Sequence, residues 1–465
     1  MEVCQRCKKE IAIIRSRKEF FCNKCFTKFV SLKQRKRMMG DEYYRNVFKV
    51  AYNKDGTHEV GKVVMGFDFQ SSCLVALDII IELLREQYHQ HGGRVGFTLD
   101  IVSVYQNNKT LNHFKDAWEC ICSSERYSND RILDYVKIHF INADTFYHKK
   151  NLMQILVHNI NFDSMALDWD EKYNYSIEDL LKACPNRNTR NDFWNIIVQH
   201  TVKQFAMQTK CSVLIWGNSM TKLADQILGL VIKGRGANIA ASLDSESLDK
   251  AYGNIFKNLY PMKDILLSEI DAYIICQKMD SLLVDYTLRK SLIISDEDSK
   301  KENVNTTLIK NMSINELVRK YYEDMEGEYS NIISTVLRTG DKLQAPTKYL
   351  EEGTIPQICF ICSNAIYSNP SVWLNSITVD EGHPIETEEE KEYYKQWKES
   401  KMGVETEQYL KLRDYIWNNG DAVPLCYGCT INLNGIKGKN VIWPRNTDKE
   451  LQDVLNEYQI NADDK

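Results

Sequence analysis

The sequence has no long hydrophobic run and little proline, with 8 proline residues in 465. No apolar stretch approaches the roughly 20 residues that cross a membrane, and Cys4, Arg6 and Lys8 interrupt any apolar centre of a secretory signal. With 43% hydrophobic and 26% charged residues, the composition is that of a globular protein rather than a disordered or fibrous one. We therefore expect two or three domains without membrane contact, in the cytoplasm or nucleus.

Glycine is also missing from a turn that would be expected to contain it. Residues 62–84 begin as a short apolar strand and end as a helix, because apolar residues recur there at steps of three and four. A strand, a tight turn and a helix open many α/β nucleotide-binding domains, since the first turn of the helix directs free N–H groups at an anion. After Gly66 this turn contains other residue types: Asp68, Phe69, Ser71 and Ser72. The stretch predicts the shape of a phosphate loop and leaves open whether the loop binds phosphate.

Charge is unevenly distributed along the chain. Residues 1–62 hold 16 Lys and Arg against 7 Asp and Glu, whereas the remainder holds 43 against 57. The net charge of −5 therefore combines a head of +9 with a body of −14. A basic head on an acidic body favours contact of the head with a polyanion, although a solvated charged face is the common explanation for such a run.

Eight of the 14 cysteines form four CxxC pairs, a pattern that favours metal over disulfides in a reducing compartment. The spacing of Cys4 and Cys7 from Cys22 and Cys25 is typical of a zinc ribbon, in which a hairpin brings four thiolates to one tetrahedral ion. A structural zinc would replace the core that so short a segment cannot form. Two redox-active CxxC motifs are the alternative, but no thioredoxin-like strand–helix–strand context surrounds them.

A basic segment follows these cysteines. It interleaves Phe26 and Phe29 with five cations: Lys28, Lys33, Arg35, Lys36 and Arg37. In a helix Phe29, Lys33 and Arg37 lie along one face at four-residue steps. A zinc module followed by such a helix fits contact with RNA backbone and unpaired bases, and a solvated helix is the alternative.

The next stretch, residues 61–290, predicts an α/β domain. Strands are expected at 94–105, 136–142 and 212–217, and helices at 113–128, 191–209 and 219–231, with residues 189–192 as the cap of the long helix. This alternation predicts a doubly wound parallel sheet, whose ligands bind beyond the carboxyl ends of its strands. Lys233 and Arg235 lie in a glycine-containing loop that could contact phosphate or RNA, and a simple flexible loop explains them equally well.

The C-terminal third contains the other CxxC cysteines: Cys359, Cys362, Cys426 and Cys429. The 63 residues between the two pairs do not prevent a shared zinc site, because loop-closure entropy rises slowly with length. Free structural cysteines are the alternative. Residues 380–399 hold eight acids against three lysines and predict an exposed insert, and residues 295–305 predict a linker. We divide the chain into a zinc-binding module (1–60), the α/β domain (61–290), a linker with a helical segment (291–345) and a C-terminal cysteine module (346–465).

Several motifs together resemble one known family. They are the first cysteine set, Lys33-Gln34-Arg35, Thr189–Asp192, Gly217–Ala224, Lys233–Gly236 and the two late cysteine pairs. In this order and spacing they resemble the cytoplasmic tRNA 2-thiolation protein 2 family, over nearly the whole chain. The resemblance implies the fold of the PP-loop pyrophosphatases (adenine nucleotide alpha hydrolase-like), whose active members carry S-G-G-x-D-S after the first strand.

The resemblance also implies a function, 2-thiolation of the wobble uridine (mcm5s2U) in cytoplasmic tRNAs for Lys, Glu and Gln. In such a complex the catalytic subunit adenylates the uridine, and sulfur from a thiocarboxylated ubiquitin-related modifier displaces AMP. The subunit resembled here is the heterodimeric companion, required for the modification but without an intact loop. The implied partners are tRNA, the catalytic thiolase subunit and, indirectly, the ubiquitin-related sulfur carrier of the protein urmylation pathway, all in the cytoplasm.

The loop departs from the active motif. With the final serine aligned on Ser72, the two glycines become Asp68 and Phe69 and the aspartate becomes Ser71. Asp68 places a negative charge where pyrophosphate binds, and Phe69 places a side chain where backbone must approach. We expect no catalytic residues, no ATP binding and one or two structural zinc ions. Two alternatives stay open: an ATP-dependent tRNA-adenylating sulfurtransferase, and a zinc-bearing interaction adaptor without RNA contact.

Overall fold

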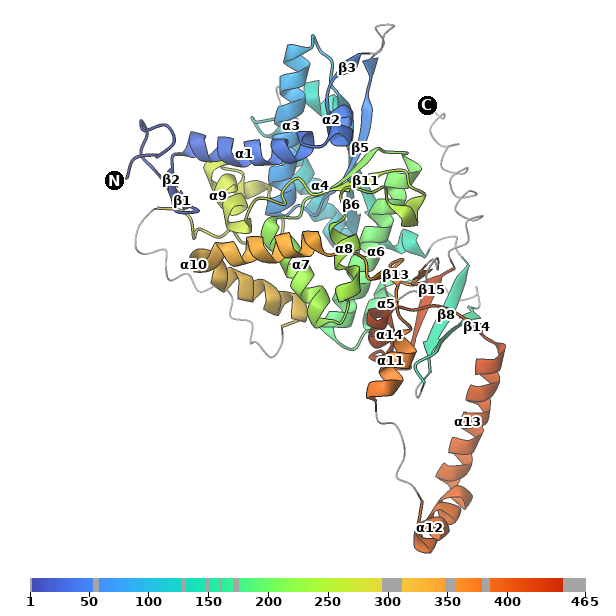
Figure 1. Ribbon diagram of the computed structural model, residues 1–465. Helices are drawn as coiled ribbons and strands as arrows, with labels where there is room; N and C mark the ends of the chain where they lie inside the picture. Colours follow the sequence, from blue (N-terminus) through green and yellow to red (C-terminus); the bar gives the residue numbers. More distant parts are fainter. Residues whose placement is uncertain are drawn as a thin grey trace. The chain divides into compact units, whose positions relative to one another are not determined.

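The computed structural model divides into two compact units, one formed by residues 1–146 and 191–345 and the other by residues 147–190 and 346–465 (Figure 1). The structure describes residues 2–52, 58–127, 131–147, 151–158, 161–169, 175–294, 312–347, 356–378 and 385–445. Within these ranges no helix is both long and apolar enough to cross a membrane. The linker predicted at 295–305 lies outside the described residues.

The first unit is built on a five-stranded parallel sheet. Its strands are β5 (Gly61–Gly66), β6 (Phe97–Tyr105), β7 (Val136–Asn142), β10 (Val213–Trp216) and β11 (Lys257–Leu259). Their order is β11-β10-β5-β6-β7, so the chain moves outward from β5 to β7 and resumes at β10 on the other side of β5. The topological switch point, where ligands of such sheets bind, therefore lies between β5 and β10.

Helices cover both faces of this sheet. Val63 and Met65 of β5 belong to one buried cluster with α3 (Ser71–Gln90), whereas Val64 between them belongs to another, with Val202 of α6 (Arg187–Gln208). Because successive strand side chains point to opposite faces, β5 is buried on both. This unit also contains α4 (Asn108–Ser123), α7 (Met220–Ile232), α8 (Ile239–Leu243), α9 (Leu267–Gln277) and α10 (Ile314–Lys342). The predicted doubly wound parallel sheet is confirmed.

Two helices begin earlier than predicted because of their caps. The side chain of Asn186 accepts the N–H of Thr189 (2.7 Å), so α6 starts at Arg187 and residues 189–192 lie inside the helix rather than in its cap. The side chain of Asn107 accepts the N–H of Thr110 (3.0 Å) and starts α4 ahead of the predicted residue 113.

The N-terminal cysteine module packs on the α/β domain within the first unit. It contains β1 (Ile14–Ser16), β2 (Glu19–Phe21), α1 (Asn23–Met39) and α2 (Glu42–Phe48), followed by the short pair β3 (Ala51–Tyr52) and β4 (His58–Glu59). Phe26, Val30 and Met38 recur along one side of α1 and join the buried cluster of α3. This shared core ties the module to the sheet domain.

The second unit contains an antiparallel sheet with the order β14-β9-β8-β15. Its strands are β8 (Leu152–Val157), β9 (Ser164–Asp168), β14 (Asp421–Ala422) and β15 (Asn440–Pro444). Because β8 pairs with β15, residues 147–190 join the C-terminal unit, whereas the sequence placed them in the α/β domain. The other elements are α5 (Ile177–Ala183), β12 (Gln357–Ile358), β13 (Ala365–Ile366), α11 (Pro370–Ile377), α12 (Glu388–Glu399), α13 (Lys401–Asn419) and α14 (Tyr427–Asn434).

Candidate functional site

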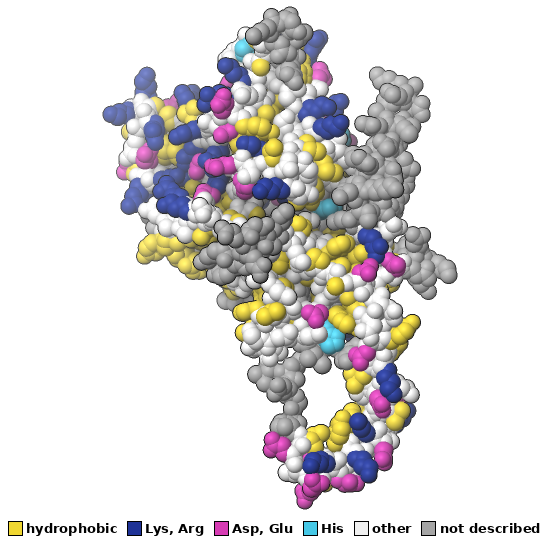
Figure 2. All heavy atoms as spheres, turned by 45° about the vertical axis from the view of Figure 1, so that its right-hand side comes forward, with side chains coloured by type: hydrophobic (Ala, Val, Ile, Leu, Met, Phe, Trp, Pro, Cys, Tyr) yellow, Lys and Arg dark blue, Asp and Glu magenta, His cyan; other side chains and the backbone are white. Residues whose placement is uncertain are grey.

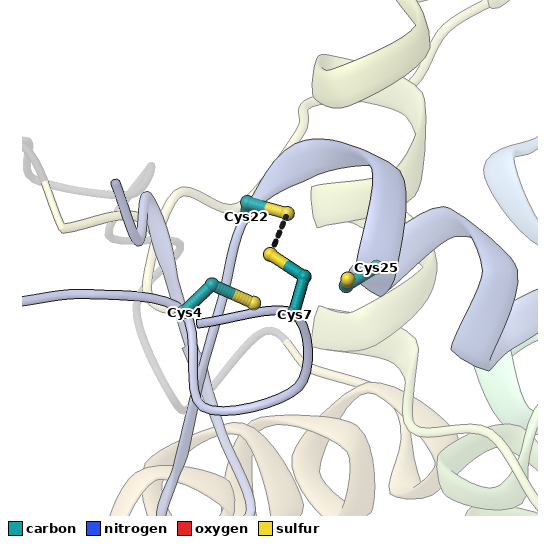
Figure 3. A group of neighbouring side chains, drawn as sticks. All are labelled: Cys4, Cys7, Cys22 and Cys25. Carbon is teal, nitrogen blue, oxygen red and sulfur yellow. Dashed lines mark hydrogen bonds between the residues drawn. The ribbon is translucent and has the colours of Figure 1, made fainter. Parts of the chain in front are cut away.

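The first cysteine set converges at the start of α1 (Figure 3). The sulfur atoms of Cys4, Cys7, Cys22 and Cys25 all lie within 4.8 Å of one another, and those of Cys7 and Cys22 are 3.8 Å apart. Four sulfurs bound at about 2.3 Å to one tetrahedral ion are about 3.8 Å apart. The geometry therefore fits a single metal ion held by all four thiolates.

The four thiols of this set differ in their titration: the pKa values of Cys4 and Cys7 are lowered, whereas burial raises those of Cys22 and Cys25. Burial works to raise the pKa of Cys4, but backbone N–H groups of Cys7, Cys22 and Arg6 lower it to about 6. Cys22 directly precedes α1 and Cys25 lies in its first turn, where the helix dipole stabilises negative charge. Since metals bind the thiolate and not the thiol, Cys4 and Cys7 are the members of the set that are most readily deprotonated for a cation.

The second cysteine set repeats this plan. Cys359 and Cys362 lie at the turn between β12 and β13, Cys426 directly precedes α14, and Cys429 lies in its first turn. All four sulfurs again lie within 4.8 Å of one another, with 3.6 Å between Cys362 and Cys426. The N–H of Cys426 donates to the sulfur of Cys359 (3.3 Å). The two distant pairs form one potential metal site, as the sequence predicts.

The first set differs in one respect from the zinc ribbon predicted by its sequence, and the second set has the same arrangement. The second pair of each set lies at a helix N-terminus instead of on a second hairpin knuckle. The sulfurs are also too close together to surround a cluster of several irons. Four thiolates around a single tetrahedral centre are typical of structural zinc.

Two loops meet at the switch point between β5 and β10. One leads from β5 into α3 and the other from β10 into α7. They approach so closely that a Cβ on Gly217 would lie 2.5 Å from the sulfur and 2.9 Å from the Cα of Cys73. Packing therefore requires glycine at position 217, and the two sequence stretches that flank the expected phosphate site are adjacent.

Asp68 fills the anion position of this loop with its own carboxylate. Its Oδ1 accepts the N–H of Gln70 (3.0 Å), the residue that precedes α3. Its Oδ2 lies 3.6 Å from Nζ of Lys222, which also donates to Oε1 of Gln70 (3.0 Å). Partial burial works to raise the pKa of Asp68, but Lys222 and the Gln70 N–H hold it below its usual value. An ionised carboxylate thus occupies the helix start where an active loop holds phosphate.

Phe69 acts differently from the sequence-based expectation. Its φ of +56° lies in the left-handed region that glycine prefers, so the backbone keeps the conformation of a glycine-containing turn. Its ring is fully buried, edge-on to Phe67 (centroids 4.7 Å apart) and stacked on Phe114 (4.8 Å). Aromatic packing offsets a backbone cost of about 1–2 kcal/mol. The side chain therefore points into the core and does not cover the loop backbone, which leaves Asp68 as the residue that fills the site.

The basic residues of α1 have unequal surroundings. Lys33 turns toward the α/β domain, where its Nζ donates to the carbonyl of Asp264 (3.1 Å), lies 4.0 Å from Glu269 and sits 4.3 Å from the ring centroid of Phe29. Burial lowers the pKa of Lys33 to about 8. Arg35 forms an ion pair with Glu86.

Other cations of α1 face solvent. Lys28 and Lys36 are exposed, eight residues apart along the helix, and Arg37 is half-buried beside them. The predicted set of RNA-contacting residues is therefore divided between cations that stabilise the fold and cations that are accessible to a ligand.

Lys233 and Arg235, which the sequence predicted as phosphate contacts, form ion pairs with an aspartate of α6. Nζ of Lys233 donates to Oδ1 of Asp192 (2.6 Å), and a guanidinium nitrogen of Arg235 lies 3.3 Å from Oδ2. All three side chains are largely buried. Asp192 of the Thr189–Asp192 motif therefore forms one ion-pair cluster with Lys233 and Arg235 of the Lys233–Gly236 motif, although the two motifs are far apart in the sequence.

Glu269 is a key residue that the sequence analysis missed. This fully buried carboxylate accepts hydrogen bonds from Ser16 Oγ (2.7 Å) and Arg17 Nε (2.7 Å), and it caps α9 by accepting the N–H of Leu266 (2.9 Å). It anchors the cysteine module to the α/β domain. A glutamate in the first turn of a helix predicts only a cap, so no local pattern indicates its distant partners.

Known proteins of one family resemble this chain over nearly its whole length. The family model for cytoplasmic tRNA 2-thiolation protein 2 matches residues 313–431. The sequence is 41% identical to the protein of that name from Candida glabrata and 39% identical to that from Saccharomyces cerevisiae strain RM11-1a, each over 99% of both chains. Among solved structures, the U34-tRNA thiolase NcsA from Methanococcus maripaludis, with its 4Fe–4S cluster, is similar at a TM-score of 0.47 and 16% identity, covering 78% of this chain and 96% of that chain.

Proposed function

The chain belongs to the cytoplasmic tRNA 2-thiolation protein 2 family, and on that basis we propose that it is the tRNA-binding, non-catalytic subunit of a tRNA thiolase. It works in the cytoplasm as a heterodimer with a catalytic PP-loop subunit that thiolates the wobble uridine of tRNAs for Lys, Glu and Gln. The ubiquitin-related modifier delivers its sulfur to the catalytic subunit, so this chain meets the carrier only indirectly.

The occupied anion position is the observation that carries the non-catalytic role. Asp68 accepts the N–H of Gln70 and faces Lys222, the cation that a bound phosphate would need. A phosphate charge about 4 Å from this carboxylate would be repelled by about 4 kcal/mol at a partly buried site, which corresponds to roughly a thousandfold in affinity. Adenylation is therefore assigned to the partner.

The exposed side of α1 supports the RNA-binding role. Lys28, Lys36 and Arg37 follow the first cysteine set on one rigid helix and are accessible to phosphate oxygens. Lys33, Arg35, Lys233 and Arg235 are engaged with carboxylates and have supporting positions. We expect one or two structural zinc ions in the two cysteine sets, Cys4–Cys25 and Cys359–Cys429, where a bound ion would fix α1 or α14 by its first turn.

Reconstitution tests this function. Purified chain, catalytic subunit, tRNA, ATP and sulfur donor are combined, and 2-thiouridine is measured by mass spectrometry with each protein omitted in turn. Thiouridine is expected only when both proteins are present, and isothermal titration of this chain alone should show no ATP binding. Micromolar ATP binding that is lost on changing Asp68 would indicate an adenylating enzyme. Failure of the assembled pair to bind tRNA would indicate an adaptor without RNA contact.

A further inference from the structure

Helices α12 and α13 form a helical arm of the second unit (Figure 1). No residue of α12 is buried, and Gly403 is the only buried one among the described side chains of α13. Ser400 ends α12 and caps α13 by accepting the N–H of Gly403 (3.2 Å), so one residue joins the two helices. An isolated helix of the length of α12, 12 residues, is marginal in water without packing. The arm therefore has helical faces that nothing in the described part of the chain covers.

These faces carry large apolar and aromatic side chains. Along α13, Met402, Tyr409 and Ile416 recur every seven residues with Leu412 between them, and Met402, Tyr409 and Leu412 are 70%, 56% and 57% exposed. This spacing is that of a helix seam that packs against another helix. α12 adds three exposed rings: Tyr393, Tyr394 and Trp397. Tyr, Trp and Met are enriched in protein interfaces, so this concentration of exposed apolar and aromatic side chains favours a binding surface.

The charge of the arm restricts what can bind there. Residues 385–399 hold six glutamates against three lysines, and Figure 2 shows charged side chains interspersed with hydrophobic ones along the arm. Glu388, Glu389 and Glu390 also stabilise the first turn of α12 through the helix dipole, which explains their position but not the neighbouring rings. RNA and anionic lipid surfaces would both be repelled by this acidic run.

We propose that the arm is a docking site for a protein partner with a cationic groove. The seam of α13 lies in the apolar floor of the groove, and the glutamates of α12 face Arg and Lys side chains at its rim, with Tyr393 and Trp397 as anchors. A second copy of this chain fits less well, because a symmetric contact would bring two acidic runs together. The inference rests on the proposed function, under which this partner is the catalytic thiolase subunit.

Binding measurements with full-length protein test the docking site. One variant removes the seam (Tyr409→Ala with Leu412→Ala), and a second reverses charge at the rim (Glu388→Lys with Glu389→Lys). Asn418→Ala, which changes an exposed residue on the opposite side of α13, is the matched control. Affinity for the purified catalytic subunit is measured by surface plasmon resonance at low and high salt. Both variants should weaken binding about tenfold or more. The charge variant should lose its effect at high salt, and the control should bind like the wild type.

The outcomes separate this inference from the proposed function. If the pair forms with unchanged affinity in both variants while thiolation still needs this chain, the docking site is wrong and the function stands. If thiolation does not need this chain at all, the function fails. Sedimentation of the chain alone tests whether the arm binds a second copy of the chain, and tRNA filter binding tests whether it binds RNA. Variants that abolish only self-association, or only tRNA binding, would overturn the proposal. Unchanged zinc content and circular dichroism confirm that each variant is folded.

Discussion

Nζ of Lys222 lies 3.6 Å from Oδ2 of Asp68, across the switch point of the parallel sheet. The lysine belongs to the first turn of α7, and the aspartate belongs to the loop that starts α3. Each is at the place where an α/β protein receives an anionic ligand, and here they neutralise each other. The loop therefore keeps the architecture of a phosphate site, but its cation, Lys222, is already paired with Asp68.

Replacing Asp68 should therefore expose an anion site. In Asp68→Asn the carboxylate is removed at nearly constant volume and Lys222 loses its counter-ion, so affinity for inorganic pyrophosphate should rise at least about tenfold over the wild type. Isothermal titration of the isolated chain measures this. Adding Lys222→Ala should abolish the gain, and the exposed substitution Asp280→Asn should have no effect. Equal, weak binding by all four proteins would show that the loop has no latent anion site.

Metal analysis should find one to two zinc ions per chain. Cys4→Ser should lower the zinc content through the first set and Cys429→Ser through the second, because loss of one thiolate opens a four-coordinate structural site. Cys184→Ser changes a buried cysteine outside both sets and serves as the control. Elemental analysis of the purified variants is the measurement. Finding no zinc in the wild type would remove the metal assignment.

The exposed lysines of α1 should contribute to RNA affinity through charge alone. Lys28→Ala with Lys36→Ala should reduce the slope of log K against log salt by about 0.7 per lysine for single-stranded contacts. Fluorescence anisotropy with tRNA at several salt concentrations, on the assembled heterodimer, measures the slope. Lys182→Ala, an exposed lysine of the second unit, should leave it unchanged. An unaltered slope in the double variant would place the RNA contact elsewhere.

Glu269 should prove to be a stability residue. Glu269→Gln leaves Arg17 and Lys33 without their shared carboxylate, and the free energy of unfolding should fall by about 3 kcal/mol. Glu19→Gln breaks the exposed pair with Arg6 and should cost no more than about 1 kcal/mol. Urea unfolding compares the two variants. Similar stability losses in both would argue against the anchoring role.

The pH dependence of stability should include a contribution from Asp225. Burial raises its pKa to about 7 from an ordinary 3.8, against the opposing charges of Arg319 (3.4 Å) and Arg289, while Glu323 adds to the increase. The folded state therefore holds a proton that the unfolded state has lost between about pH 4 and 7. Stability falls as pH rises through this window, by up to about 4 kcal/mol.

Asp225→Asn should remove this fall, because the amide stays neutral at every pH. The variant should be more stable than the wild type near pH 8 and similar to it near pH 4. Urea unfolding at the two pH values measures the difference, and Asp280→Asn should keep the wild-type profile. A variant that is less stable than the wild type at both pH values would show that the Arg319 pair outweighs desolvation.

Much of this protein was determined by its local sequence. The strands at 136–142 and 213–216 follow from short apolar runs, and each CxxC pair of the two cysteine sets that could hold a metal ion follows from local spacing, because these features depend on residues close in the chain. The strand, turn and helix start at residues 62–84 likewise follow from the local sequence, which left open whether the loop binds phosphate.

Tertiary structure decided the properties that depend on distant partners. In the folded chain, Lys233 and Arg235 form ion pairs with Asp192, and Lys33 lies near Glu269. Tertiary structure also paired β8 with β15, which moved residues 147–190 into the second unit. A sequence shows that a residue is charged or that a strand is apolar. Only the folded chain shows which opposite charge lies within 4 Å, because that distance depends on how remote segments pack.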